Sequence, residues 1–258
     1  MILTTGATGT VGSRVAAALA GHPTRAVSRT TTPRFDWTDR STWGAVLDGV
    51  DAVFIVPLDG EALTGPFLRH CADQGVHRVV LLSGRGVDVP GYAPTDSGSG
   101  LTHTSGEKAV RASDREWTVL RPTWFAQNFT EGLFADALRA GDLRLPAGDG
   151  AAPFVDADDI AEVAAAVLTG DGHAGRTYEL TGPRALTLAE VAGHFPGARY
   201  TPVPAAEYVA DLVAQGWPRL DAEDMAATVT AIERGLDTPV SDGVRQVLGR
   251  APRPFPAV

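Results

Sequence analysis

The chain opens with Met1-Ile-Leu-Thr-Thr-Gly6-Ala-Thr-Gly9-Thr-Val-Gly12, in which a short apolar run leads directly into three evenly spaced glycines. The run predicts a short strand, and the strong helix formers of Val11–Ala20 predict a helix. Between these elements, Gly6 would permit a tight turn, Gly9 would let the backbone approach a pyrophosphate, and Gly12 would let the helix pack close to the strand. The phosphates would lie against the amides of the helix N-terminus, where the dipole favours negative charge. A plain glycine turn is the alternative, but the position between strand and helix favours a phosphate-binding loop formed by Gly6, Thr8, Gly9, Thr10, Val11 and Gly12.

The first half of the chain continues to alternate short apolar runs with amphipathic stretches. A helix is predicted from about Glu61 to Gln74, ending at Gly75. Continuous apolar runs are typical of parallel strands that are covered on both faces. Strand and helix alternating with short loops predict an α/β fold with a right-handed, doubly wound parallel sheet of the Rossmann type. Its further strands are predicted at Arg25–Ser28, at a run ending in Phe35–Trp37, and at Asp51–Pro57, Arg78–Ser83 and Thr118–Arg121.

A second, smaller region is predicted from the change of pattern near residue 123. A helix begins at the acidic cluster Asp156–Asp159, Thr177–Thr181 returns one last strand, and the pattern from Leu186 onward is mostly helical. The Gly-, Ser- and Pro-rich segment Gly84–Gly100 is long enough to form a lid. We expect a nucleotide-binding domain from residues 1–122 and 154–182, and a smaller, mostly helical C-terminal cap from residues 123–153 and 183–258.

Composition excludes several classes of protein. The 258 residues are 44% apolar, which excludes a disordered chain, and their formal net charge of −9 argues against a nucleic-acid partner. No run reaches the roughly 18 apolar residues that span a bilayer, and no basic segment precedes an apolar run as in a signal peptide. The lone Cys71 cannot form an internal disulfide, so we expect a cytoplasmic protein. We also expect a monomer or homodimer without a membrane partner.

Metal and hydrolytic chemistry are not predicted either. The six histidines are scattered, with no pair at ligand spacing. Helix capping explains Asp156, Asp158 and Asp159 better than a metal does. The chain contains no Gly-x-Ser-x-Gly motif and no P-loop.

The end of the second predicted strand decides which dinucleotide fits. An acidic residue there would bind the ribose hydroxyls of NAD, whereas an arginine would accept the 2′-phosphate of NADP. The chain offers Ser28-Arg29, with Arg25 and Arg34 nearby and no acid before Asp36. Arg29 therefore predicts a preference for NADP(H), with NAD(H) as the alternative, and Asp36 is placed for the adenine edge. A solvated arginine and a plain turn aspartate are the alternatives at these two positions.

Several stretches together resemble the NmrA-like branch of the atypical short-chain dehydrogenases. Within that branch they are most similar to the bacterial group related to the ergot-alkaloid clavine reductases. The resemblance implies a Rossmann fold, an NADP-type cofactor and reduction of a small, often polycyclic substrate, although the branch also contains redox sensors that bind the cofactor without turnover. The stretches that carry it are Thr5–Gly12, Phe35–Asp39, Gly49–Phe54, Val79–Ser83, Trp117–Phe129, Pro153–Ile160 and Tyr178–Pro183.

The chain departs from the wider superfamily at the catalytic helix. Short-chain dehydrogenases usually carry a Tyr-x-x-x-Lys pair there, but no tyrosine of this chain has a lysine four residues later. The only lysine, Lys108, lies on the expected helix with Thr104 in the place of the tyrosine, so it is a candidate for the nicotinamide ribose. His103 and Glu107 form a second pair at helical spacing, in which a carboxylate-held imidazole would donate a proton. Ser83, at a strand end, is the third catalytic candidate; surface and capping roles are the alternatives for all three.

The expected substrate follows from the aromatic residues and from the missing tyrosine. Trp124, Phe125, Asn128 and Phe129 follow the sixth predicted strand and would wall a pocket for a flat ligand, although core packing is the simpler role for at least two of them. Ketone reduction creates an alkoxide that needs a proton donor, whereas reduction of an iminium ion neutralises charge. The site therefore favours an electron-poor, conjugated polycyclic, quinonoid or iminium-type substrate, with a secondary-metabolic role expected. A natural-product tailoring enzyme with net oxygenation or rearrangement and a non-enzymatic NADP(H) sensor are the alternatives.

Overall fold

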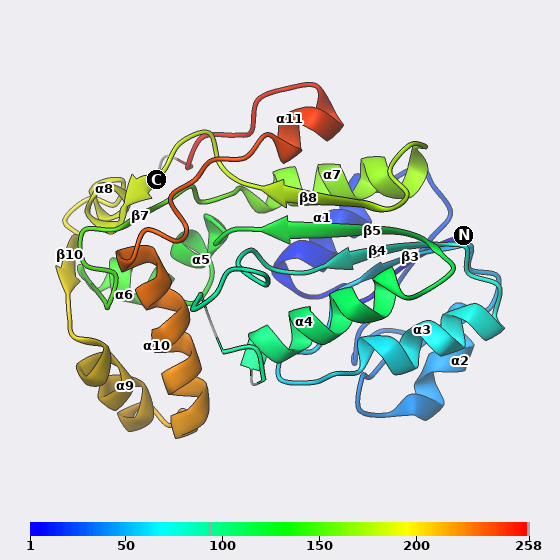
Figure 1. Ribbon diagram of the computed structural model, residues 1–258, viewed down its shortest axis with the longest axis horizontal. Helices are drawn as coiled ribbons and strands as arrows, with labels where there is room; N and C mark the ends of the chain where they lie inside the picture. The colour runs from blue at the N-terminus through cyan, green and yellow to red at the C-terminus, as the bar shows by residue number, and fades with distance from the viewer. Residues whose placement is uncertain (93, 97, 257–258) are drawn as a thin grey trace.

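The computed structural model describes residues 1–92, 94–96 and 98–256. Its centre is a sheet of six strands in the order β2-β1-β3-β4-β5-β8, in which every neighbouring pair is parallel (Figure 1). The order reverses between β1 and β3, which is where open α/β sheets form their nucleotide crevice. The predicted Rossmann-type sheet is confirmed, with strands β1 (Ile2–Thr4), β2 (Thr24–Ala26), β3 (Ala52–Ile55), β4 (Arg78–Leu82), β5 (Glu116–Pro122) and β8 (Arg176–Leu180).

Both faces of the sheet are buried under helices. Successive strand residues face opposite sides, so Ile2 and Phe54 belong to one apolar cluster while Leu3 and Val53 belong to the other. The first cluster is covered by α1 (Thr10–Ala18), α7 (Ala157–Thr169) and α11 (Gly243–Leu248). The second is covered by α2 (Trp43–Leu47), α3 (Thr64–Asp73) and α4 (Gly98–Arg111), which lie below the sheet in Figure 1.

The acidic cluster at the start of α7 caps that helix, as expected. The Asp156 side chain accepts a hydrogen bond from the Asp158 amide at 2.8 Å, and Asp158 and Asp159 occupy the first turn, where the helix dipole favours negative charge. Asp159 is buried and also accepts hydrogen bonds from the Arg250 and Arg253 guanidinium groups. These contacts fasten the C-terminal segment across α7. Although α11 falls within the range expected for the cap, it packs on α7 and β8.

The predicted strand ending at Phe35–Trp37 is wrong. These residues lie in an irregular segment after β2, followed by a short 3-10 helix, η1 (Arg40–Thr42). Phe35 and Trp37 pack edge-to-face on each other and on Phe67 of α3, with ring centroids 5.0–5.4 Å apart. The Trp37 indole donates a hydrogen bond to the Val56 carbonyl at 3.1 Å. The aromatic run thus fills the core beneath α3 instead of extending the sheet.

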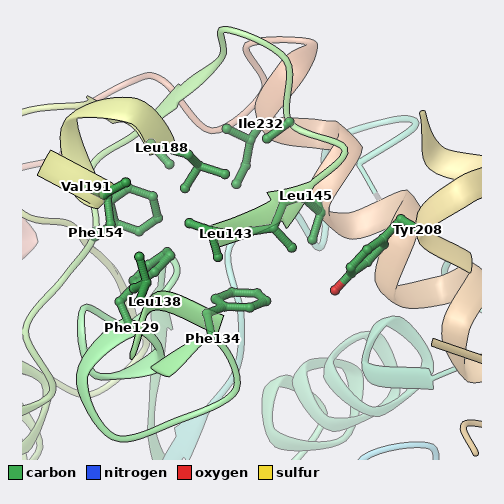
Figure 2. Close-up of a cluster of buried hydrophobic side chains, with 14 of the residues drawn as sticks. Phe129, Phe134, Leu138, Leu143, Leu145, Phe154, Leu188, Val191, Tyr208 and Ile232 are labelled. Carbon is green, nitrogen blue, oxygen red and sulfur yellow. The ribbon is translucent and has the colours of Figure 1, made fainter. Parts of the chain in front are cut away.

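The smaller region has its own apolar core and more strand than expected. Two short two-stranded sheets form, from β6 (Asp142–Leu145) with β10 (Arg199–Pro202) and from β7 (Ala151–Ala152) with β9 (Leu186–Thr187). Around them lie α5 (Gln127–Thr130), α6 (Ala135–Arg139), α8 (Leu188–Gly193), α9 (Ala205–Ala214) and α10 (Arg219–Glu233). Figure 2 shows the core that these elements share, with the aromatic rings of residues 129, 134 and 154 close together.

The expected lid segment is a loop that leads into α4, and two of its residues, 93 and 97, lie outside the described part of the chain. The Tyr92 ring covers the backbone of Gly86, where a Cβ atom would lie 2.2 Å from the ring. The Tyr92 hydroxyl donates to the carboxylate of Asp237 at 2.7–2.8 Å, and Arg234 donates to the Gly91 carbonyl at 2.6 Å. The loop is therefore tied to the segment that follows α10.

Candidate cofactor and substrate site

The glycine turn has the geometry that a bound diphosphate needs. Gly6 has φ of +66°, a left-handed conformation that favours glycine, and a Cβ atom at Gly12 would lie 2.1 Å from the Gly6 carbonyl oxygen. Gly9 is the N-cap of α1 and supplies no side-chain hydrogen bond to the helix. The first-turn amides of α1 therefore lack intrahelical partners. These features fit a dinucleotide phosphate group, with the dipole of α1 adding to the attraction.

A cavity of about 710 Å³ extends from this turn across the carboxyl ends of β1, β3, β4 and β5 to α4 and α10. Such a volume accommodates a cofactor-sized ligand. The cavity brings together ten of the residues predicted from the sequence: Gly6, Gly9, Thr10, Val11, Gly12, Ser83, His103, Trp124, Phe125 and Asn128.

Five predicted residues lie elsewhere. Thr8, Arg29 and Lys108 are exposed, and neither they nor the half-buried Asp36 are among the described residues that line the cavity. Phe129 is 1% exposed and packs against the Phe134 and Phe154 rings, so it belongs to the core of the smaller region (Figure 2). Lys108 lies one turn beyond the cavity-lining Thr104 along α4, and its side chain is exposed.

The arginines near the end of β2 have different partners. Arg25 donates to the carbonyls of Val46 and Asp48, and Arg34 pairs with Asp36 at 2.6 Å. Arg29 makes no hydrogen bond or ion pair within the described residues, which leaves its guanidinium group available to an anion. Hydrogen bonds from Thr38 lower the pKa of Asp36, and Arg34 and Arg29 lower it further.

Beneath the cavity, Ser83 belongs to a buried ionic network. Its hydroxyl donates to Glu107 Oε1 at 2.8 Å. Arg121 of β5 binds the same carboxylate through Nε at 2.7 Å and Nη2 at 2.8 Å, and Arg111 donates to Oε2 at 2.9 Å. Burial acts to raise the pKa of Glu107, but the hydrogen bonds from Arg121, Arg111 and Ser83 outweigh it and hold the pKa below its usual value. Glu107 is therefore an anion, and the Ser83 proton is directed toward it.

This network corrects the predicted His103–Glu107 pair. Both residues lie on α4 at the expected spacing, yet Arg121 and Arg111 occupy the carboxylate and no hydrogen bond joins it to the imidazole. The His103 ring lies against Gly84 instead, where a Cβ atom would be 2.9 Å from Nε2. Burial lowers the pKa of His103 despite the nearby charges of Asp59 and Glu107, so the imidazole is neutral at pH 7.

The sequence-based site missed the acidic and aromatic wall that α10 and the residue Trp217 just before it contribute. Trp217, Asp221, Met225 and Thr228 line the cavity at helical spacing, and Asp224 lies beside them. From the loop after β3, Asp59 adds another carboxylate. The three- and four-residue spacing was readable in the sequence, but it did not show that this helix face covers the cavity.

A buried Tyr92–Asp237 pair was also missed. Tyr92 lines the cavity, and the Asp237 carboxylate that accepts its hydroxyl proton is fully buried. Burial raises the pKa of Asp237, and the hydrogen bond from Tyr92 and the charge of Arg85 offset only part of this effect. Burial likewise raises the pKa of Tyr92, which stays protonated. A tyrosine is thus present at the cavity, but it comes from the loop and is directed toward Asp237.

Two further observations concern the described residues as a whole. Among residues 1–92, 94–96 and 98–256, no group of three or more His, Cys, Asp and Glu side chains is arranged to hold a metal ion. None of the helices in the same part of the chain combines the length and the apolar character that a membrane crossing requires.

A glycine turn at the switch point of a parallel sheet, opening into a long cavity, defines a dinucleotide-binding protein of the Rossmann class. The chain belongs to the NAD(P)H-binding family, whose model matches residues 6–171, and to its NmrA-like branch. The predicted NAD(P)H cofactor and the predicted family are therefore confirmed.

Individual relatives place the chain among oxidoreductases. It is 32% identical to an NAD(P)H azoreductase of Xenophilus azovorans, over 99% of this chain and 95% of the relative. It is 33% identical to the festuclavine dehydrogenase of Aspergillus fumigatus, over 86% of this chain and 80% of the relative. Its fold resembles that of the NADPH-dependent quinone oxidoreductase of Escherichia coli in complex with NADPH, with a TM-score of 0.82 at 24% identity, covering 99% and 97% of the two chains.

Proposed function

We propose that this protein is an NADP(H)-preferring reductase in secondary metabolism, which transfers hydride to a small, flat, electron-poor metabolite of polycyclic, quinonoid or iminium type. An iminium-type cation is the substrate that the site favours most. The observation that carries this choice is the hydrogen bond from Ser83 to the buried Glu107 carboxylate, because it determines what the cavity can offer to a reacting atom.

The Ser83 hydroxyl has one proton, and it is donated in the hydrogen bond to the Glu107 carboxylate. Toward the cavity Ser83 therefore presents lone pairs, which repel a developing alkoxide and favour a positive centre. Tyr92 directs its proton to Asp237, and the neutral His103 imidazole is a weaker acid than an imidazolium ion would be. Reduction of a ketone would need a donor aimed at the oxygen, whereas an iminium ion loses its charge when hydride arrives and needs none.

The other charged side chains that line the cavity also favour a cationic substrate. Asp59, Asp221 and Asp224 are carboxylates, while Arg85 is the one guanidinium among the described lining residues. The carboxylates attract a cationic substrate. The Trp124 and Phe125 rings, together with Trp217 just before α10, offer apolar faces to a planar ring system.

The cofactor would be held by the chain's amino-terminal turn. The Thr10–Gly12 amides would bind the diphosphate, since the Gly9 amide already donates to the Gly6 carbonyl, and Arg29 would bind the 2′-phosphate that distinguishes NADPH. When bound, NADPH supplies the hydride at its nicotinamide ring. The Ser83 lone pairs and the aromatic faces would orient the substrate carbon, and the loop tied down by Tyr92 would limit access of water.

The test is NADPH consumption with a matched panel: a cyclic iminium salt, the corresponding neutral ketone and a quinone. We expect steady consumption with the iminium salt, less with the quinone and least with the ketone. Equal or faster ketone reduction would contradict the argument from Ser83. Tight NADPH binding without consumption across a broad panel would favour the sensor, and oxygen-dependent product formation would favour the oxygenating tailoring enzyme.

A further inference from the structure

Two buried polar atoms on α4 have no protein partner. His103 Nδ1 and Thr104 Oγ1 are inaccessible to solvent and make no hydrogen bond among the described residues. Both residues line the cavity. A buried polar group without a partner is costly, and in native proteins it usually marks the place of a missing ligand or water molecule.

The position of these atoms along the sheet indicates which ligand group they meet. The His103 ring lies against Gly84, directly after Ser83 at the carboxyl end of β4. The phosphate turn lies at β1, and Arg29 lies after β2 on one side of it. A dinucleotide bound across the switch point with its adenosine half toward β2 directs its other half toward β3 and β4. The nicotinamide riboside would therefore reach Gly84 and the ring above it.

We propose that His103 and Thr104 bind the hydroxyl groups of the nicotinamide ribose. A ribose diol offers two groups that each donate and accept, and an imidazole nitrogen together with a threonine hydroxyl can satisfy both. Gly84 makes this arrangement possible because any side chain there would displace the imidazole. The sequence suggested Lys108 for this ribose, but its side chain is exposed and is not among the described residues that line the cavity. His103 and Thr104, about one turn earlier on α4, would bind the ribose instead.

A neutral pair suits this task. The diol carries no charge, and a buried ammonium group would have to be desolvated beside the Arg121 and Arg111 guanidinium groups that already surround Glu107. The inference rests on NAD(P)H binding and not on the proposed substrate, so it stands or falls separately from the iminium hypothesis.

The experiment measures binding, by titration calorimetry, of three probes that end at successive points of the cofactor. Adenosine 2′,5′-bisphosphate ends before the second ribose, 2′-phospho-ADP-ribose includes it, and NADPH adds the nicotinamide. The variants are Thr104→Val, which removes the hydroxyl at nearly constant volume, and His103→Phe, which keeps a ring over Gly84. Lys108→Met is the matched control on the same helix.

Each variant should weaken NADPH and 2′-phospho-ADP-ribose by about fivefold, the loss typical of one hydrogen bond, and leave adenosine 2′,5′-bisphosphate unchanged. Lys108→Met should change none of the three. The proposal is wrong if all three probes keep wild-type affinity, if the bisphosphate weakens equally, or if Lys108→Met reproduces the loss. Thr104→Val alone decides the matter if the His103 variant fails to fold.

Discussion

Replacement of Glu107 by Gln tests the buried network beneath the cavity. The carboxylate is 4% exposed and receives four hydrogen bonds, two from Arg121 and one each from Arg111 and Ser83. Removing one partner of a buried ion pair costs about 3–5 kcal/mol, because the other charge stays buried. Arg121 keeps its 2.8 Å contact with Asp88, so we expect about 3 kcal/mol, or roughly 6–12 °C in Tm for a chain of this size.

The matched control is Glu223→Gln on α10, where an exposed carboxylate pairs with Arg219 at 3.4 Å. Such a surface pair is worth about 0–1 kcal/mol. Both variants are compared with the wild type by thermal and urea unfolding followed by circular dichroism. If Glu107→Gln loses no more stability than Glu223→Gln, Glu107 is not the centre of a buried ionic network.

The role of Glu107 can also be tested by measuring how the stability of the wild type and of Glu107→Gln changes with pH. The folded chain holds the pKa of Glu107 below the ordinary value of 4.5. Its contribution is therefore fully present above pH 4.5, and it is lost as the pH falls from there through the lower folded-state pKa. The wild type should lose stability over this range more steeply than Glu107→Gln. Parallel curves for the two proteins would contradict the assignment.

Three further predictions concern the cofactor, the substrate and the loop. Arg29→Asp should weaken NADPH much more than NADH in titration calorimetry, and an equal loss would show that Arg29 does not bind the 2′-phosphate. Asp221→Asn should raise KM for an iminium substrate about twofold to fivefold and leave KM for a quinone unchanged, with Glu223→Gln as the silent control; equal effects on both substrates would remove the electrostatic argument. Tyr92→Phe should cost about 1–3 kcal/mol in urea unfolding, because it leaves the buried Asp237 carboxylate without its main donor, and an unchanged midpoint would refute that role.

The parts of the structure that could be predicted are those encoded by local sequence. The glycine turn, the strand before it and the helix after it are all specified within residues 2–18, and the structure contains them as predicted. The Asp156 cap is equally local, since its side chain bonds an amide two residues later. Phe35–Trp37 shows the limit of such reasoning, because an apolar aromatic run fits a strand and a packed loop equally well.

The parts that could not be predicted depend on residues far apart in the chain. Helical spacing paired His103 with Glu107, but Arg121 arrives from β5 and offers two hydrogen bonds where the imidazole offers one. That competition is invisible until the strand and the helix are placed together. Asp221 and Tyr92 were missed for the same reason, since their roles depend on α10 and the loop meeting at one cavity.

The central claim is that the amino-terminal turn holds the diphosphate of NADPH, and Gly9→Val tests it most directly. Gly9 has an extended backbone that any residue adopts, and a Cβ atom there would lie 3.4 Å from the Gly6 carbonyl oxygen, so the fold should tolerate the change. The new side chain would occupy the path of the phosphates. Calorimetry should then show NADPH affinity reduced at least about a hundredfold with Tm nearly unchanged, while Gly193→Ala, on an open face of α8, binds like the wild type. Undiminished affinity in Gly9→Val would contradict the account.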